Sequence, residues 1–179
     1  MYCSYMIEVE VKVRGWDNVE EQIIMLGGVL IGIEEHLDVY FNHSSRDFKV
    51  TDEALRLRRV NSHVELTYKG PRIGSISKTR EEITLTISDF NTCREMLKKL
   101  SFKEVIEVFK VRRVYRLNEF KINLDDVRGL GKYIEVEAEA LSISDIPSVE
   151  EKVRKLLEGF GFHEEQFIRK TYLELLLEG

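Results

Sequence analysis

Charged side chains recur at every second position along several short segments, and their signs are sorted. Carboxylates pair two residues apart at two places, and bases pair two residues apart at two others. Because side chains alternate between the two faces of a β-strand, residues two apart share a face and lie about 7 Å apart. The four pairs are Glu8 with Glu10, Glu135 with Glu137, Arg56 with Arg58, and Lys110 with Arg112.

This combination of charges suits the binding of a triphosphate together with a divalent cation. Arginine contacts phosphate oxygens through two donors at once, and lysine acts as a point charge. Carboxylates beside such an anion would repel it unless Mg²⁺ or Mn²⁺ lay between them, taking oxygen ligands from both. The bases on the polar faces are Lys12, Arg56, Arg58, Lys69, Arg80, Lys110 and Arg112, and the acids are Glu8, Glu10, Glu82, Asp125, Glu135 and Glu137.

A simpler interpretation is that these charges form the solvated outer faces of a β-sandwich. For any single strand this alternative is the better one. It weakens for the whole set, because a solvated face would also carry serine, threonine, glutamine and asparagine without a sorted pattern.

Strict alternation of apolar and polar residues predicts about eight strands. Capping residues and apolar spacing predict helices, for which Asp17, Asp89 and Ser148 with Glu151 are the expected N-terminal caps. The order is strand, helix, three strands, the same series again, then helices. We therefore expect an α+β fold that is mainly β, a closed eight-stranded antiparallel barrel with helices packed outside and two similar βαβββ halves. The predicted strands are 7–13, 37–41, 55–58, 66–69, 80–87, 109–112, 120–125 and 134–139, and the helices 19–26, 91–100, 149–157 and 172–177.

Length and composition set the remaining expectations. With 179 residues, the chain should form a single domain over residues 1–179. A net charge of −5 argues against a general nucleic-acid binder. Two cysteines without paired spacing, no signal segment and no long apolar stretch predict a cytoplasmic protein without a membrane span. An apolar outer face of the barrel would also suit a homodimer.

At these residues the sequence resembles the CYTH family, the triphosphate tunnel metalloenzymes. The pattern Glu-x-Glu-x-Lys at residues 8–12 is weak alone, but an ordered series of further matches follows it along almost the whole chain. The matching segments are 36–41, 54–58, 67–71 (Thr-Tyr-Lys-Gly-Pro), 78–82 (Lys-Thr-Arg-Glu-Glu), 110–112, 124–131, 134–137 and 170–172.

The resemblance implies a role for each charged residue that matches the family's pattern. The triphosphate ligands would be Lys12, Arg56, Arg58, Lys69, Lys110 and Arg112, with Arg80 as a further one. The metal ligands would be Glu8, Glu10, Asp125, Glu135 and Glu137. Glu82, Tyr40 and Lys170 are accessory candidates beside this set, and Tyr40 could equally be a tyrosine that supports arginine side chains.

The resemblance also implies an enzyme, and it leaves the reaction open. The run of motifs looks most like the class IV adenylyl cyclases, which convert ATP to cyclic AMP and pyrophosphate. The alternatives are a hydrolase of inorganic tripolyphosphate, thiamine triphosphate or another organic triphosphate, and a non-catalytic binder of nucleotide or polyphosphate.

Overall fold

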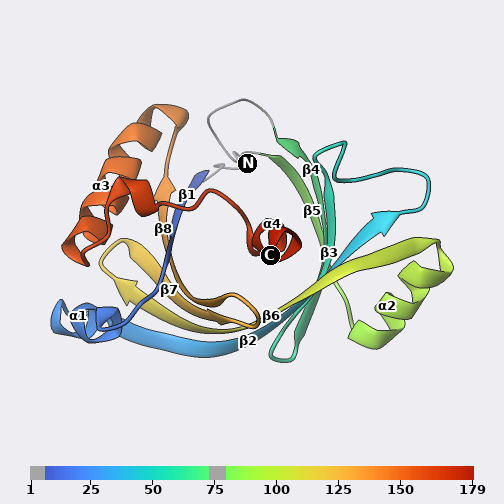
Figure 1. The fold of residues 1–179 in the computed structure, drawn as a ribbon, viewed down its shortest axis with the longest axis horizontal. Helices are drawn as coiled ribbons and strands as arrows, with labels where there is room; N and C mark the ends of the chain where they lie inside the picture. Colours follow the sequence, from blue (N-terminus) through green and yellow to red (C-terminus); the bar gives the residue numbers. More distant parts are fainter. Residues whose placement is uncertain (1–6, 73–79) are drawn as a thin grey trace, which may run out of the picture. The chain divides into compact units, whose positions relative to one another are not determined.

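The structure is a computed structural model that describes residues 7–72 and 80–179. Within these residues the chain forms eight strands, four α-helices and two short 3-10 helices (Figure 1). The strands are β1 (Ile7–Arg14), β2 (Val29–His43), β3 (Ala54–Val60), β4 (His63–Arg72), β5 (Arg80–Thr86), β6 (Phe102–Leu117), β7 (Phe120–Val127) and β8 (Gly131–Ala140). The helices are α1 (Val19–Met25), α2 (Phe90–Lys99), α3 (Ile146–Gly159) and α4 (Tyr172–Glu178), and the 3-10 helices are η1 (Ile143–Asp145) and η2 (Glu164–Gln166).

The order of the elements is the predicted one. The series β1, α1, β2, β3, β4 is followed by β5, α2, β6, β7, β8, and then by α3 and α4. Two strands are much longer than predicted, since β2 begins at Val29 and β6 at Phe102. Their first segments lack strict alternation, so a search for a period of two does not detect them.

The strands form one sheet in the order β1-β8-β7-β6-β2-β3-β4-β5. The strands pair antiparallel in β1–β8, β2–β3, β3–β4, β4–β5 and β7–β8. β1 and β5 stand at the two ends of this order, and no ladder joins them within the described residues. The mainly antiparallel eight-stranded sheet is thus confirmed, and closure into a barrel is not.

Two of the predicted helix caps are wrong. Asn18, not Asp17, precedes α1, and the Asp17 carboxylate instead lies 3.2 Å from Lys132 Nζ. α3 begins at Ile146, so Ser148 lies inside the helix; Pro147 suits this first turn because its fixed φ is already helical. The third cap is confirmed, since Asp89 accepts a hydrogen bond from Thr92 N at 2.7 Å. None of the described helices has both the length and the apolar character needed to cross a membrane.

The chain packs as two compact units. The terminal unit comprises residues 1–34 and 111–179, and the central unit comprises residues 35–110. In the terminal unit, α3 lies against β1 and β8 (Figure 1) and buries Val153 and Leu157 on the apolar face of these strands. Each such buried side chain contributes about 1.5–3 kcal/mol, and the opposite face of the same strands is left to the charged residues.

The central unit has its own apolar core. α2 packs on β3 and contributes Phe90, Cys93 and Leu97, which meet Val39 and Leu57 of the sheet. Burial raises the pKa of the Cys93 thiol, which is consistent with a small core residue.

Candidate metal and phosphate centres

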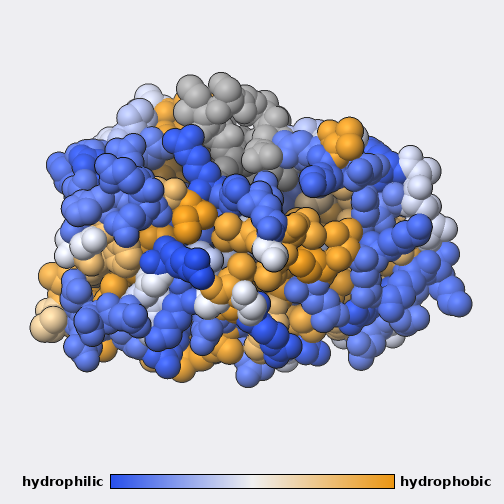
Figure 2. Space-filling view, viewed as in Figure 1, coloured by the Kyte–Doolittle hydropathy of each residue, from blue (hydrophilic) through white to orange (hydrophobic). Residues whose placement is uncertain are grey.

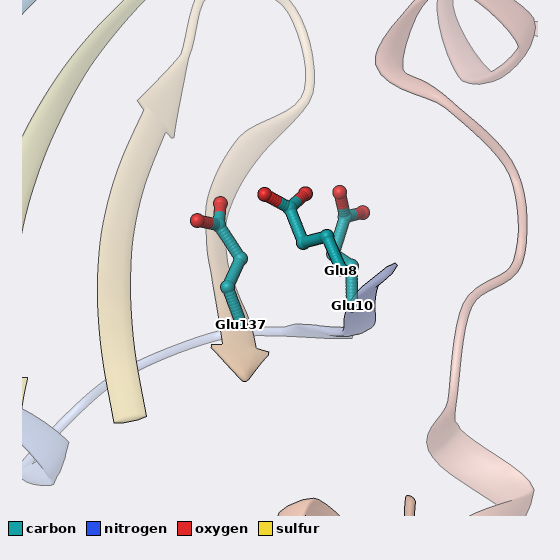
Figure 3. A group of neighbouring side chains, drawn as sticks. All are labelled: Glu8, Glu10 and Glu137. Carbon is teal, nitrogen blue, oxygen red and sulfur yellow. The ribbon is translucent and has the colours of Figure 1, made fainter. Parts of the chain in front are cut away.

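The register of β1 with β8 brings acidic residues together in the terminal unit. Glu10 is opposite Glu137 and Lys12 is opposite Glu135, while Glu8 is two residues from Glu10 and so shares its face. One carboxylate oxygen from each of Glu8, Glu10 and Glu137 lies within 4.8 Å of the others (Figure 3). We call these three residues the carboxylate triad.

The triad has the electrostatics of a cation site. Desolvation raises the pKa of Glu8, and the negative charges of Glu137 and Glu10 raise it further. Three carboxylates this close repel one another, and a hard divalent cation that takes oxygen ligands would relieve the repulsion. The donor set therefore fits Mg²⁺ or Mn²⁺.

Two residues that the sequence analysis did not select hold one carboxylate of the triad. Asn123 Nδ2 donates to Glu137 Oε1 at 2.6 Å, and Lys121 Nζ lies 2.8 Å from Glu137 Oε2. Asn123 is fully buried, and its Oδ1 has no hydrogen-bond partner among the described atoms. Both residues lie on the polar face of the predicted strand 120–125, where their alternation with apolar residues could have identified them.

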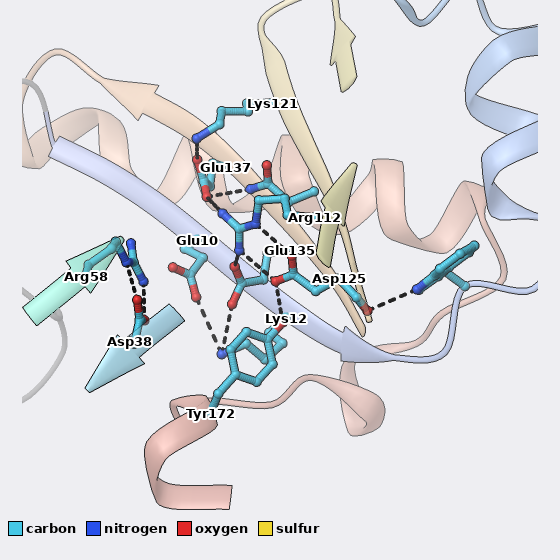
Figure 4. A network of polar contacts seen from close by, with 12 residues as sticks. Glu10, Lys12, Asp38, Arg58, Arg112, Lys121, Asp125, Glu135, Glu137 and Tyr172 are labelled. Carbon is cyan, nitrogen blue, oxygen red and sulfur yellow. Dashed lines mark hydrogen bonds and ion pairs between the residues drawn. The ribbon is translucent and has the colours of Figure 1, made fainter. Parts of the chain in front are cut away.

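A second network in the same unit surrounds Arg112 (Figure 4). The Arg112 guanidinium donates from Nε and Nη2 to the two oxygens of Asp125, each at 2.7 Å, and Nη2 also contacts Glu135. Tyr172 donates its hydroxyl to Asp125 Oδ2 at 2.8 Å. Asp125 and Glu135, which the resemblance implies as metal ligands, are thus paired with a base here and lie outside the carboxylate triad.

Lys12 belongs to this network as well. Its Nζ lies 3.1 Å from Glu135 Oε1 and 3.8 Å from Glu10 Oε1, and it is 4.3 Å from the centre of the Tyr172 ring. Lys12 also donates to the backbone oxygen of Lys170 at 3.0 Å. The two predicted phosphate ligands of this unit, Lys12 and Arg112, are therefore both buried and both neutralised by carboxylates.

The segment before α4 brings residues into the network that are distant in sequence. Ile168 forms an isolated bridge with Lys12, and Tyr172 at the start of α4 is buried. Burial, followed by the negative charges of Glu135 and Asp125, raises the pKa of Tyr172. The Lys170 side chain instead points to Glu178, 2.5 Å from its carboxylate, so only the backbone of this accessory candidate meets Lys12.

The predicted bases of the central unit lie on β3, β4, the start of β5 and the part of β6 that ends at Lys110. Asp38 of β2, opposite Arg58, accepts from Arg58 Nε at 2.6 Å and from Nη2 at 2.5 Å. Burial alone would raise the pKa of Asp38, but the hydrogen bonds and charge of Arg58 lower it below its usual value. Asp38 is thus a positioning residue for Arg58. It lies in the predicted strand 37–41, and no role was predicted for it.

Arg56 differs from Arg58 because its Nε is buried and has no hydrogen-bond partner in the described part of the chain. Tyr40 lies opposite Arg56, and burial raises its pKa. A buried guanidinium donor without an acceptor costs free energy until an anion accepts from it. This atom is the clearest indication of an anion ligand in the central unit.

The remaining candidates are placed as follows. Lys69 lies 2.6 Å from Glu82, and burial and the charge of Arg56 lower the Lys69 pKa. Lys110 is buried. Arg80 begins β5, but its side chain lies outside the part of the chain that the structure describes.

Comparison with known proteins decides the family. The family model described as the CYTH domain matches residues 6–172. The chain belongs to the CYTH family. Members of this family are metal-dependent proteins that act on triphosphates. The matched range contains every acid and base that was selected from the sequence.

Two archaeal proteins are similar to this CYTH chain over nearly their whole length. A Methanocaldococcus jannaschii protein, provisionally named an adenylate cyclase, is 43% identical over 172 residues, which is 95% of this chain and 98% of that protein. A solved structure from Pyrococcus horikoshii is 44% identical with a TM-score of 0.82, covering 96% of this chain and 98% of that one.

A more distant CYTH-like fold comes from Hippeastrum. That structure, of a provisionally named adenylyl cyclase described as having a dominant triphosphatase activity, has a TM-score of 0.69 and 20% identity. The match covers 97% of this chain and 96% of that one, and at this identity it shows the fold alone.

Proposed function

We propose that this CYTH protein is a metal-dependent enzyme that converts ATP to cyclic AMP and pyrophosphate. The observation that carries the proposal is the carboxylate triad, whose ligand atoms lie within 4.8 Å of one another. The name of the M. jannaschii relative, at 43% identity, supports a cyclase. A single family match over residues 6–172 supports the further proposal that residues 1–179 act as one domain.

Glu8, Glu10 and Glu137 would hold Mg²⁺ or Mn²⁺, and Asp125 and Glu135 would join them once their bases contact substrate. The cation, when bound, neutralises charge that develops on the phosphate oxygens and lowers the pKa of a hydroxyl that it coordinates. Asn123 and Lys121 hold Glu137 in place, so this member of the triad is oriented before a cation arrives.

The bases would bind the triphosphate oxygens. In the central unit Arg58 is fixed by Asp38, and Arg56 already has a donor without an acceptor. In the terminal unit Lys12 and Arg112 would exchange carboxylate oxygens for phosphate oxygens. In the cyclase reaction the ribose 3′-oxygen bonds to the α-phosphorus, the bond from that phosphorus to the leaving pyrophosphate breaks, and the hydroxyl proton is released to water.

A second candidate is hydrolysis of a triphosphate. It is favoured by the composition of the candidate site, since the acids there can bind cations and the bases can bind phosphate oxygens, whereas none of them is specific for a nucleoside. The activity described for the Hippeastrum protein is the reason to test it.

One experiment separates these candidates. The full chain is incubated with ATP, inorganic tripolyphosphate or thiamine triphosphate, each with Mg²⁺ or Mn²⁺, and the products are identified by chromatography and phosphorus NMR. Cyclic AMP with pyrophosphate supports the cyclase. Phosphate release without cyclic AMP rejects the cyclase in favour of the hydrolase, and binding without turnover rejects both.

Matched variants test the metal ligands in the same assay. Glu137→Gln keeps the shape of the side chain and removes its charge, so metal-dependent turnover should fall at least a hundredfold (about 2.7 kcal/mol). Glu165→Gln changes an exposed glutamate of η2 in the same way and should leave turnover unchanged. Equal activity of both variants would remove Glu137 from the metal site.

A further inference from the structure

Apolar side chains gather on the surface where α1 ends and β2 begins. Ile24, Met25 and Leu26 are followed by the edge segment, residues 29–33, whose Val29, Leu30, Ile31 and Ile33 are also exposed. The exposed fractions of these seven side chains run from 46% to 77%. Figure 2 shows hydrophobic atoms at the surface in this region, at the lower left of the view. Exposed apolar patches of this kind mark interaction sites.

The edge segment also has an open backbone edge. Pairing of β2 with β3 ends at His36 opposite Val60, and just beyond it Glu35 accepts from Asn61 N and donates to Asn61 Oδ1, both at 3.0 Å. In an antiparallel ladder, alternate residues direct both N–H and C=O to the same side. Ile33, Ile31 and Val29 therefore direct theirs to the β3 side, where the described part of the chain provides no further strand.

The start of the edge segment is held firmly. Gly27 adopts a positive φ of 88°, and a Cβ on Gly28 would lie 2.3 Å from Ile23 Cγ2. Only glycine permits this close approach of β2 to α1. The turn before the open edge therefore packs directly on the core residue Ile23. Because this turn is fixed, the edge segment is held in position for pairing with a partner strand and does not readily rearrange.

We infer that the edge segment pairs with the edge segment of a second copy of this chain, antiparallel and with a two-fold axis at Ile31. In this register Val29 lies opposite the partner's Ile33, and Leu30 lies opposite the partner's Gly32. The residues that direct their N–H and C=O groups to the open edge are Val29, Ile31 and Ile33. Each of them would therefore form two backbone hydrogen bonds with the residue opposite it in the partner. Glu34 falls opposite the partner's Gly28, so no carboxylate faces another.

The exposed apolar surface is large enough for such a dimer. At about 100 Å² of apolar surface for a whole Ile, Leu, Val or Met, the seven exposed fractions correspond to about 400 Å² per copy. If two copies bury all of this apolar surface, about 800 Å² is removed from water, and with an apolar share of about 60% the full interface reaches about 1,300 Å². This lies within the range of specific stable interfaces, roughly 1,200–2,000 Å².

A second copy fits this surface better than a membrane does. Residues 17–35 contain five acidic residues and neither lysine nor arginine. Segments that bind anionic lipid surfaces carry a basic polar face, so the charge here opposes that partner.

The test is the mass of the full-length protein in solution, measured by light scattering and sedimentation velocity. The wild-type protein should have twice the monomer mass of 21.0 kDa. Ile31→Lys and Ile31→Glu each place a like-charged pair on the two-fold axis, so each variant alone should be monomeric at concentrations where the wild type is dimeric. Ile143→Lys is the matched control, because Ile143 is an exposed isoleucine of η1 outside the edge segment, and this variant should stay dimeric.

Mixing the two Ile31 variants gives the decisive result. Lysine opposite glutamate should restore the dimer, which also shows that each variant is folded. A monomeric wild-type protein, a dimeric Ile31→Lys protein, a monomeric Ile143→Lys protein or a mixture that stays monomeric would each overturn the proposal. Binding of the monomeric wild type to lipid vesicles would overturn it in favour of a membrane partner.

Discussion

Replacing Asp125 by asparagine would keep the shape of the buried network around Arg112 and remove one of its negative charges. In the wild-type protein this carboxylate accepts two hydrogen bonds from Arg112 and one from Tyr172, and it is fully buried. The asparagine side chain has one acceptor oxygen in place of the two of aspartate, and it carries no charge. We expect the variant to fold and to be clearly less stable.

The expected loss follows from the partners that remain. Leaving a buried charge without its partner costs about 3–5 kcal/mol. Arg112 would still contact Glu135 and would lie 3.6 Å from Glu137 Oε1, so the compensation is partial. We therefore expect a loss of about 2–3 kcal/mol, which for a chain of this length lowers the Tm by about 5–10 °C.

Urea denaturation followed by circular dichroism, without metal or nucleotide, measures this free energy of unfolding. Asp126→Asn is the matched control, because the neighbouring aspartate is exposed and its change should cost less than about 0.5 kcal/mol. In a double-mutant cycle with Arg112→Met, the coupling between residues 112 and 125 should be about 2 kcal/mol.

Two outcomes would refute the reasoning. If Asp125→Asn unfolds within about 0.5 kcal/mol of the wild type, the carboxylate does not neutralise Arg112 in the ligand-free protein. If the coupling is near zero while the single variants are unstable, the loss comes from packing and not from the ion pair.

Three further perturbations have expected outcomes. Arg58→Met should weaken tripolyphosphate binding about 10- to 100-fold, as one bidentate contact is lost; unchanged affinity in calorimetry would place this residue outside the site. Arg94 holds the pKa of Glu104 down at about 2, so the ion pair should stabilise the protein above pH 4.5 and lose this effect as the pH falls toward 2; Arg94→Gln should flatten that part of the pH–stability curve, and an unchanged curve would contradict the assignment. Gly28→Ala should lower the free energy of unfolding by about 1–3 kcal/mol because its Cβ meets Ile23 at 2.3 Å, and a variant as stable as the wild type would show that the turn can relax.

Alternation along the sequence was sufficient to predict all eight strands and their order, because one face of each strand is apolar and the other polar. It failed where this contrast is lost. The edge segment of β2 is apolar on both faces, so it shows no contrast between an apolar face and a polar face. This segment is a strand because of its hydrogen bonds with the rest of the sheet, and a local sequence pattern does not predict those hydrogen bonds.

The candidate site could be predicted in part for a similar reason. Spacing identifies residues that share a face, so the acids and bases could be grouped by face from the sequence, and their roles as ligands stay a prediction. It does not identify which acid meets which base, because that depends on register between strands. Asp38, Lys121 and Asn123 lie on the same polar faces and gained their roles only when β2 was paired with β3 and β7 with β8. Tyr172 is 47 residues from Asp125, and no periodicity predicts that contact.

The pairing of Lys12 and Arg112 with carboxylates has a consequence for how an anion would bind in the terminal unit. Each base has a counter-ion supplied by the protein, so an incoming phosphate takes the place of a protein carboxylate more than of dissolved salt ions. The affinity for the anion would then reflect the difference in free energy between ion pairs with phosphate and ion pairs with protein carboxylates. It would depend on ionic strength less steeply than the number of basic side chains suggests. The released carboxylates would in turn be free to bind a divalent cation, so binding of the anion and binding of the cation would favour each other.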